Sequence, residues 1–151
     1  MNRLKTFEAY SDKTMSTLSE INLLAGKAGL PQFEATGDEK VGKWYKDMFK
    51  SDIIFYFTID NRKDKGTRDE YGWTYRFSIG EGKNKEGKRH YTSDDKYFCV
   101  YESWFTTPRM GGIDLQKIDE NTKGFDNLES AVSWVKEMYD KKRKGNPLSR
   151  R

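Results

Sequence analysis

The sequence predicts an α+β domain with N-terminal helices, a three- to four-stranded antiparallel sheet, and a C-terminal amphipathic helix packed on one sheet face. Three observations lead to this fold class. Apolar residues recur with a helical period near both ends of the 151-residue chain, and with a period of two between residues 52 and 106. The segments that join the period-two runs are too short and polar for crossover helices, so the strands should be antiparallel.

The first helix is expected around residues 17–28. Thr17 and Glu20 have the spacing of a capping box, and an apolar run follows them. Gly29 and Pro31 mark the end of this helix. Residues 4–16 could extend it upstream, although their apolar spacing is irregular.

A second helix is expected over residues 39–50, after Asp38 as its cap. Its apolar residues are Val41, Trp44, Tyr45, Met48 and Phe49. They recur at helical spacing and form one aromatic face, so this helix needs an apolar surface to cover.

The period-two runs predict strands at residues 52–60, 71–80 and 97–106, and a shorter one at 113–118 after turn signals. In the first two strands, one face carries Ile53, Phe55, Phe57 and Ile59, and Trp73, Tyr75, Phe77 and Ile79. In the third, the alternation separates Phe98, Val100 and Trp104 from Tyr97, Cys99, Tyr101 and Phe105.

The chain ends with the clearest helix, which we expect to begin after Asp126, with Glu129 completing a capping box. Its apolar stripe consists of Leu128, Ala131, Val132, Val135, Met138 and Tyr139. A stripe of this kind has to pack on a sheet face. The predicted element order is therefore α-α-β-β-β-(β)-α, with residues 1–140 forming a single domain.

The positive net charge lies at the C-terminus. The chain has 28 Lys and Arg against 24 Asp and Glu, which gives a net charge of +4. Residues 141–151 hold six of the basic residues and no acid, which leaves residues 1–140 with a net charge of −2. Gly145 and Pro147 stop a helix, so we expect residues 141–151 to be a flexible basic tail.

Several classes of protein are not expected. No apolar run is long enough to span a bilayer, and residues 1–20 lack the pattern of a secretory signal. These features predict a cytoplasmic protein without a membrane partner. One cysteine and one histidine leave no intramolecular disulfide and no zinc site of the Cys/His type, and no cofactor is expected.

Two short motifs resemble sites for phosphate or metal. Residues 82–88 satisfy G-x-x-x-x-G-K, but Arg89 stands where a phosphate-binding loop needs Ser or Thr, and a hairpin loop is favoured. Asp60 with Glu81 and Lys83 has the D…E-x-K spacing of some magnesium nucleases. Because Glu81 lies between two glycines, a solvated turn is the favoured interpretation.

Other candidates for chemistry are single residues or incomplete motifs. His90 and Cys99 have no identifiable catalytic partner. Residues 24–30 are similar to the start of a helix-turn-helix, but no recognition helix follows. No catalytic or metal-binding residue is therefore predicted, and the sequence favours a binding protein over an enzyme.

The preferred function is nucleic-acid binding, to DNA or RNA. In the simplest register, the sheet face opposite the C-terminal helix carries Tyr56, Arg76, Tyr97, Tyr101 and Phe105. Aromatic rings and arginine on an open sheet suit base stacking and phosphate contact. The tail residues Lys141, Lys142, Arg143 and Lys144 would add phosphate attraction. The alternative is that the N-terminal helices cover this face.

A second hypothesis is a protein-binding module, or an inhibitor of a partner or host protein. Trp104 and Phe105 would serve as aromatic anchors next to the loop that carries Arg109. The net charge of −2 over residues 1–140 favours this hypothesis over a reader of duplex DNA. The small size and the composition would suit a viral accessory protein.

Overall fold

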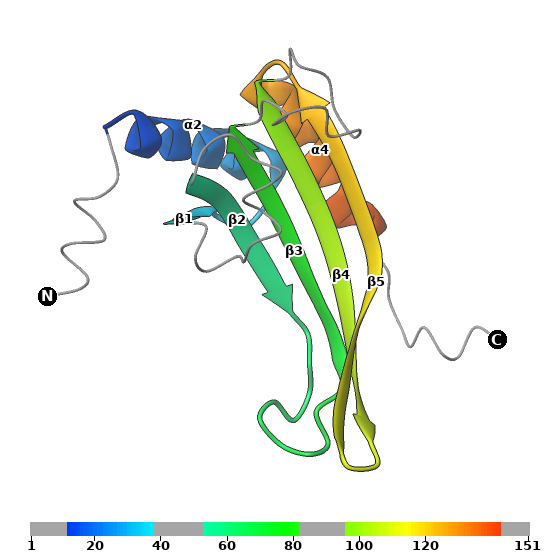
Figure 1. The fold of residues 1–151 in the computed structure, drawn as a ribbon. Coiled ribbons are helices and arrows are strands. Elements are labelled where there is room, and N and C mark those ends of the chain that lie inside the picture. Colours follow the sequence, from blue (N-terminus) through cyan, green and yellow to red (C-terminus); the bar gives the residue numbers. More distant parts are fainter. Residues whose placement is uncertain (1–11, 38–52, 82–95, 143–151) are drawn as a thin grey trace, which may run out of the picture.

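A computed structural model describes residues 12–37, 53–81 and 96–142. Within them lie helix α2 (Asp12–Ala28), strands β1 (Glu34–Gly37), β2 (Ile53–Asp60), β3 (Gly72–Glu81), β4 (Tyr97–Arg109) and β5 (Gly112–Phe125), and helix α4 (Leu128–Lys141). The strands form one antiparallel sheet in the order β1-β2-β3-β4-β5 (Figure 1). The α+β class with an antiparallel sheet is confirmed, but the sheet has five strands because β1 was not expected.

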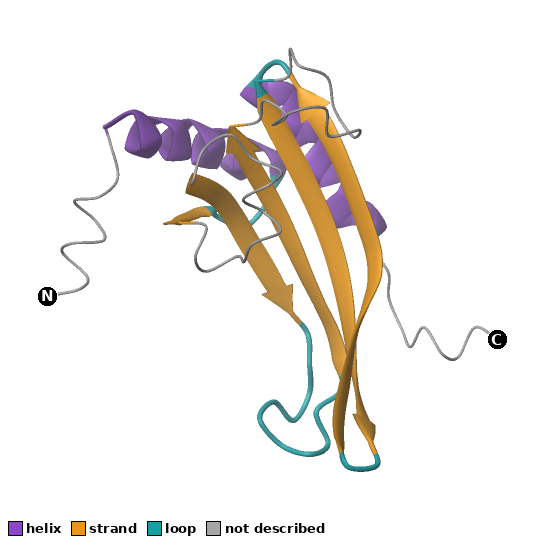
Figure 2. Ribbon diagram, in the orientation of Figure 1, coloured by secondary structure: helices purple, strands orange, loops and turns teal. Residues whose placement is uncertain are grey.

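Both described helices pack on the same face of the sheet, which we call the helix face (Figure 2). Ile21 and Ala25 of α2 and Val132 and Val135 of α4 belong to one buried cluster. The sheet contributes to it Phe55, Phe57, Trp73, Tyr75, Phe77, Ile79, Cys99, Tyr101 and Phe105. The core is therefore largely aromatic, with Phe57 and Phe77 stacked at a centroid distance of 4.8 Å.

Helix α2 begins earlier than the capping-box spacing predicts. It starts in the described residues at Asp12, so Thr17 lies inside it, and the Thr17 hydroxyl donates to the Lys13 carbonyl at 2.9 Å. Part of the upstream extension is thereby confirmed. The predicted end is also right, since Gly29 has a φ of +78° and the Leu30 amide donates to the Ala25 carbonyl.

Helix α4 is capped by Asn127 and not by Asp126. The Asn127 backbone is extended (φ −145°, ψ 158°), and its side-chain Oδ1 accepts from the Ser130 amide at 2.8 Å. Both residue types can cap a helix, and the choice is set by where β5 ends, at Phe125. The expected packing of this helix on the sheet is confirmed.

The last hairpin is much longer than expected. Strands β4 and β5 have 13 and 14 residues and pair from Tyr97 and Phe125 to Arg109 and Gly112. Pro108, expected in a turn, lies in β4 opposite Ile113. The hairpin runs past the ends of both helices, and its turn lies near the loop that joins β2 to β3 (Figure 1). We call loop 61–71 together with residues 109–115 the distal end.

Some sequence predictions lie outside the described residues. They are the helix at 39–50, the motif at 82–88 with Arg89 and His90, and the tail beyond Lys142. Neither described helix combines the length and the apolar composition needed to cross a membrane.

Candidate functional site

Two of the five residues expected on an aromatic and arginine surface do share a face. Tyr56 and Arg76 lie on the face opposite the helices, which we call the second face, in register with Ser78 and Thr58. The Arg76 guanidinium lies 5.5 Å from the centroid of the Tyr56 ring, at the distance of a cation–π contact.

The other three lie on the helix face, so the prediction that all five share one surface is wrong. The β3–β4 register sets Tyr101 opposite Phe77 and Phe105 opposite Trp73. Tyr101 and Phe105 are each 4% exposed and belong to the core, against which Tyr97 also packs. These rings are unavailable for base stacking, because stacking needs an exposed aromatic face.

The second face carries the β4 side chains that alternate with these, among them Phe98, Val100 and Trp104. Trp104 is half-buried there, with the Lys117 ammonium 5.1 Å from its ring. Lys117 Nζ also lies 3.0 Å from Glu102 Oε2 and 2.8 Å from Glu120 Oε1. These two carboxylates raise the pKa of Lys117 despite its partial burial. The lysine is therefore paired with acids and is not presented alone to a phosphate.

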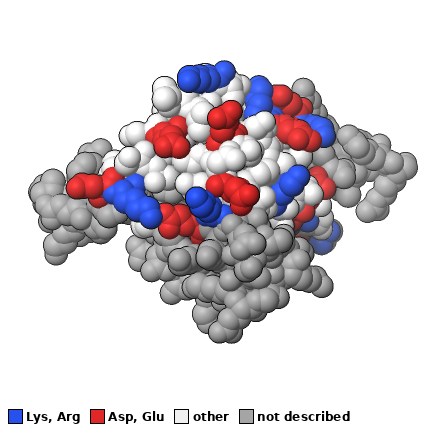
Figure 3. Space-filling model, turned by 90° about the horizontal axis from the view of Figure 1, so that it is seen from above, with Lys and Arg blue, Asp and Glu red and all other residues white. Residues whose placement is uncertain are grey.

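The described basic residues at the C-terminus also have local partners. Lys141 pairs with Glu137 at 2.8 Å, one helical turn away. Lys142 donates to the Tyr139 carbonyl at 2.9 Å and lies 3.8 Å from the Tyr139 ring centroid. Arg143 and Lys144 lie outside the described residues. On the surface shown in Figure 3, acidic and basic side chains are interspersed, without a patch of one sign.

Exposed apolar side chains gather at the distal end. Among the described residues, five large hydrophobic side chains are exposed, and four of them lie there: Tyr71, Met110, Ile113 and Leu115. Met110, at the hairpin turn, is fully exposed, and the fifth residue, Leu23, stands alone on α2. Tyr71 lies on the helix face, Ile113 and Leu115 lie on the second face, and Met110 lies at the turn between them, so the four side chains surround the tip of the sheet. Several exposed apolar side chains at one end of a fold mark an interaction site more often than scattered single residues do.

The loop beside this cluster is held in one conformation by Arg62. Its guanidinium donates to both Asp60 carboxylate oxygens, from Nε at 2.8 Å and from Nη2 at 2.7 Å. It also donates from Nη1 to Glu70 at 2.8 Å, and the other Glu70 oxygen accepts from the Gly66 amide at 2.9 Å. One arginine thus joins the end of β2 to both sides of the loop.

The electrostatics of the loop follow from these bonds. Hydrogen bonds from Arg62 hold the pKa of Asp60 well below its usual range, although partial burial acts in the opposite direction. The Gly66 amide, together with Arg62, lowers the pKa of Glu70. Both carboxylates therefore stay ionised at neutral pH, and the arginine charge is neutralised within the loop.

Backbone geometry fixes where the loop rejoins the sheet. Gly72 has a φ of +137°, and a Cβ at this position would lie 2.8 Å from the Asn61 carbonyl oxygen. Only glycine fits such a close approach in this conformation. The preceding residue, Tyr71, packs edge-on against Phe105 at 5.2 Å. The loop is thereby attached to the hairpin through an aromatic contact.

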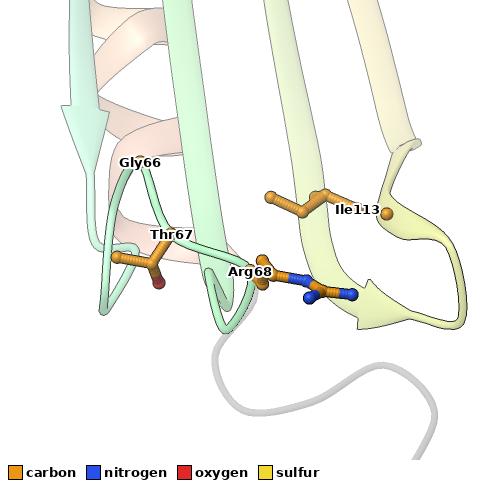
Figure 4. A pocket seen from close by; sticks show the side chains of 5 residues that line it. Gly66, Thr67, Arg68 and Ile113 are labelled. Atoms are coloured by element: carbon orange, nitrogen blue, oxygen red, sulfur yellow. The ribbon is translucent and has the colours of Figure 1, made fainter.

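A hollow of about 420 Å³ separates the loop from the hairpin. It is lined by Gly66, Thr67, Arg68, Gly112 and Ile113. Arg68 extends from the loop toward the hairpin, and Ile113 extends from the hairpin toward the loop (Figure 4). The hollow combines an apolar wall with an exposed cation, which suits a protein side chain as well as a small ligand.

The residues predicted for protein binding have separate positions. Arg109 is exposed at the distal end, 3.4 Å from Asp114. Phe105 is buried and supports Tyr71 from below, so the prediction that it is a surface anchor is wrong. Trp104 lies on the second face. The exposed anchors were missed because an apolar residue near a turn gives no sequence signal of its exposure.

The structure gives no support to the metal-binding motif and buries the single cysteine. Asp60 pairs opposite Thr74, whereas Glu81 pairs opposite Tyr97 at the other end of β3, so the metal-binding arrangement is wrong. Within the described ranges, no group of three His, Cys, Asp or Glu side chains could hold a metal ion. Cys99 is fully buried, and burial raises the pKa of its thiol.

Comparisons with known proteins give no relative from which a function could be inferred. The chain matches no protein-family model, no curated protein and no solved structure.

Proposed function

We propose that this chain is a protein-binding module and that its distal end is the contact surface. The observation that carries the proposal is that four exposed apolar side chains surround the tip of the sheet, beside a loop in which Arg62 hydrogen-bonds to Asp60 and Glu70. Binding energy at protein interfaces comes mainly from a few apolar or aromatic anchors. Tyr71 and Met110 are the anchors we assign.

Preorganisation supports this assignment. A loop that is ordered before binding loses little conformational entropy when a partner docks, and Arg62, Gly72 and Tyr71 provide that order. The charges in the loop also favour a protein over a nucleic acid. Arg62 is neutralised by two carboxylates, and Lys65 lies 3.4 Å from Asp60.

The test compares three forms of the full-length chain. Met110→Asp places a charge at the tip of the distal end, whereas Leu23→Asp places the same charge at an exposed leucine on α2. Each form is used to capture partners from nuclease-treated extract of the cells that produce the protein. A partner captured by wild type is then purified, and its dissociation constant is measured by calorimetry.

We expect Met110→Asp to weaken binding of the purified partner at least about tenfold, as removal of an interface anchor does. Leu23→Asp should bind like wild type. Equal binding by all three forms would show that the distal end is not the contact surface.

The same protein preparations are also tested for nucleic-acid binding. Labelled single-stranded and double-stranded DNA and RNA are titrated with the full chain, and fluorescence anisotropy is followed at several salt concentrations. Tight binding with a steep salt dependence, unchanged in Met110→Asp, would overturn the proposal in favour of a nucleic-acid-binding protein.

A further inference from the structure

Strand β5 is an edge strand of unusual length. It spans 14 residues from Gly112 to Phe125 and pairs with β4 on one side. In the described part of the chain, no strand pairs with its outer side. A long edge strand is a template for pairing with another chain, unless charges or irregularities prevent it. Strand β5 carries charges and also a bulge, so a chain that pairs with it has to match both.

A bulge determines which β5 side chains share a face. The register shifts between Ser103 and Trp104, so that Asp119 is opposite Ser103 and Lys117 is opposite Trp104. The extra residue is Ile118. Before it, even-numbered residues lie on the helix face, and after it the odd-numbered ones do.

We propose that β5 pairs with β5 of a second copy, antiparallel, about a two-fold axis between Ile118 and Asp119. In this register Asp114 lies opposite Lys123 of the partner subunit. Lys117, which pairs with Glu120 of its own copy at 2.8 Å, also lies opposite Glu120 of the partner subunit. Gln116 is then opposite Asn121 of the partner subunit. By symmetry, each pairing occurs twice.

The bulge selects this register. Asp114 and Lys123 are both on the helix face, and Lys117 and Glu120 are both on the second face, so each opposed pair points to the same side. A shift of one residue would set helix-face side chains against second-face ones. A shift of two would set Asp114 or Lys123 opposite an amide side chain and remove the charge pairs.

The charge pattern of β5 favours a second copy of this chain as its pairing partner. Acid and base are arranged so that the strand is complementary to its own reversed copy, which is the requirement of a two-fold interface. Opposite charges directly across an antiparallel pair stabilise it, and like charges destabilise it. An arbitrary peptide would lack this match, whereas a second copy has it by symmetry.

The described helices lie near one half of β5 (Figure 1). Helix α4 lies beside the end of β5 near Phe125, whose ring is 6.2 Å from that of Trp134. The other half of the hairpin extends beyond both helices (Figure 1). Because the strands are antiparallel, the helix-bearing half of one copy meets the helix-free half of the other.

A charge exchange tests the proposal by sedimentation velocity over a range of concentrations at low salt. Asp114→Lys and Lys123→Asp each replace two attractive pairs by two repulsive ones. Each should weaken self-association roughly tenfold or more. An equimolar mixture of the two variants, and the double variant, should restore it. Lys27→Glu, at an exposed position of α2, is the control for a change of net charge and should associate like wild type.

Recovery of self-association in the mixture and in the double variant requires contact between two antiparallel copies of β5. Positions 114 and 123 are nine residues apart on one strand, roughly 30 Å, so exchanged charges cannot meet within one copy. A wild-type chain that stays monomeric up to about 1 mM would overturn the proposal. Self-association that the exchange does not restore would also overturn it. Circular dichroism checks that each variant is folded.

Met110 and Lys123 separate this outcome from that of the proposed function, because Asp114 and Leu115 belong to both the distal end and the paired range of β5. Met110 lies outside the paired range, so Met110→Asp should self-associate like wild type. Lys123 lies at the other end of β5, so Lys123→Asp should keep its affinity for a partner held at the distal end. Loss of both properties in either variant would contradict the separation of the two surfaces.

Discussion

The loss of stability caused by Phe105→Ala tests whether Phe105 is a core residue or a surface anchor. The ring is 4% exposed, and its centroid lies 4.9 Å from that of Trp73 and 5.2 Å from that of Tyr71. Phe105→Ala should lower the free energy of unfolding by about 3–5 kcal/mol, since the cavity cannot close fully. This loss is a large part of the total stability of a domain, which is about 5–15 kcal/mol. For a chain of this size, it should lower the midpoint temperature of thermal unfolding by roughly 10 °C.

Urea denaturation followed by tryptophan fluorescence measures this change, with Tyr56→Ala as the matched control. Tyr56 is a half-buried aromatic residue on the second face, and its removal should cost about 1 kcal/mol. A cost for Phe105→Ala no larger than that for Tyr56→Ala would refute the β3–β4 register and, with it, the placement of Tyr101 and Phe105 in the core.

Four further predictions concern α4, the loop and the cysteine. Asn127→Ala should cost about 1 kcal/mol by removing the helix cap, whereas Asp126→Ala should cost much less; comparable urea midpoints for the two would contradict the cap assignment. Arg62→Met should destabilise the fold at neutral pH by about 2 kcal/mol, because Asp60 loses a bidentate partner. Since the pKa of Asp60 is lowered in the folded chain, the ionised carboxylate stabilises the fold above about pH 4, and this stabilisation is lost as the pH falls below that value. In acid titrations followed by circular dichroism, Asp60→Asn should therefore show a smaller acid-induced loss of stability than wild type. Cys99 should react with a thiol reagent slowly in the folded chain and rapidly in urea, because burial raises its pKa; fast reaction of the folded chain would show that β4 is not covered by α4.

Periodicity in the sequence was enough to predict the described helices, four of the strands and the alternation within three of them. Hydrophobic burial enforces these patterns locally, so they can be read without knowing which elements meet. Strand β1 was missed because its four residues, Glu34–Gly37, are too few to show a period. The length of β5 was missed because it is exposed on most positions and has little apolar alternation.

The candidate surface depended on information that no single strand contains. Alternation separates Tyr101 and Phe105 from Val100 and Trp104, but only the register decides which set faces the helices. The register that is observed buries the larger set of rings against Phe77 and Trp73. The Arg62 loop was equally hidden, because its partners Asp60 and Glu70 are ordinary charges in sequence and come together only through the turn at Gly72.

The two proposed surfaces have a joint consequence. Antiparallel pairing of β5 puts the distal ends of the two copies at opposite ends of a continuous sheet, each carrying its own Met110 and Tyr71. A partner with two binding sites could then be held at both ends, and avidity would raise its apparent affinity by about 10²–10⁴ if the sites are suitably spaced. A charge-reversed monomer such as Lys123→Asp should lose this gain and keep the affinity of a single site. Affinity for a single-site partner should be the same for dimer and monomer, which separates avidity from a direct effect of Lys123 on binding.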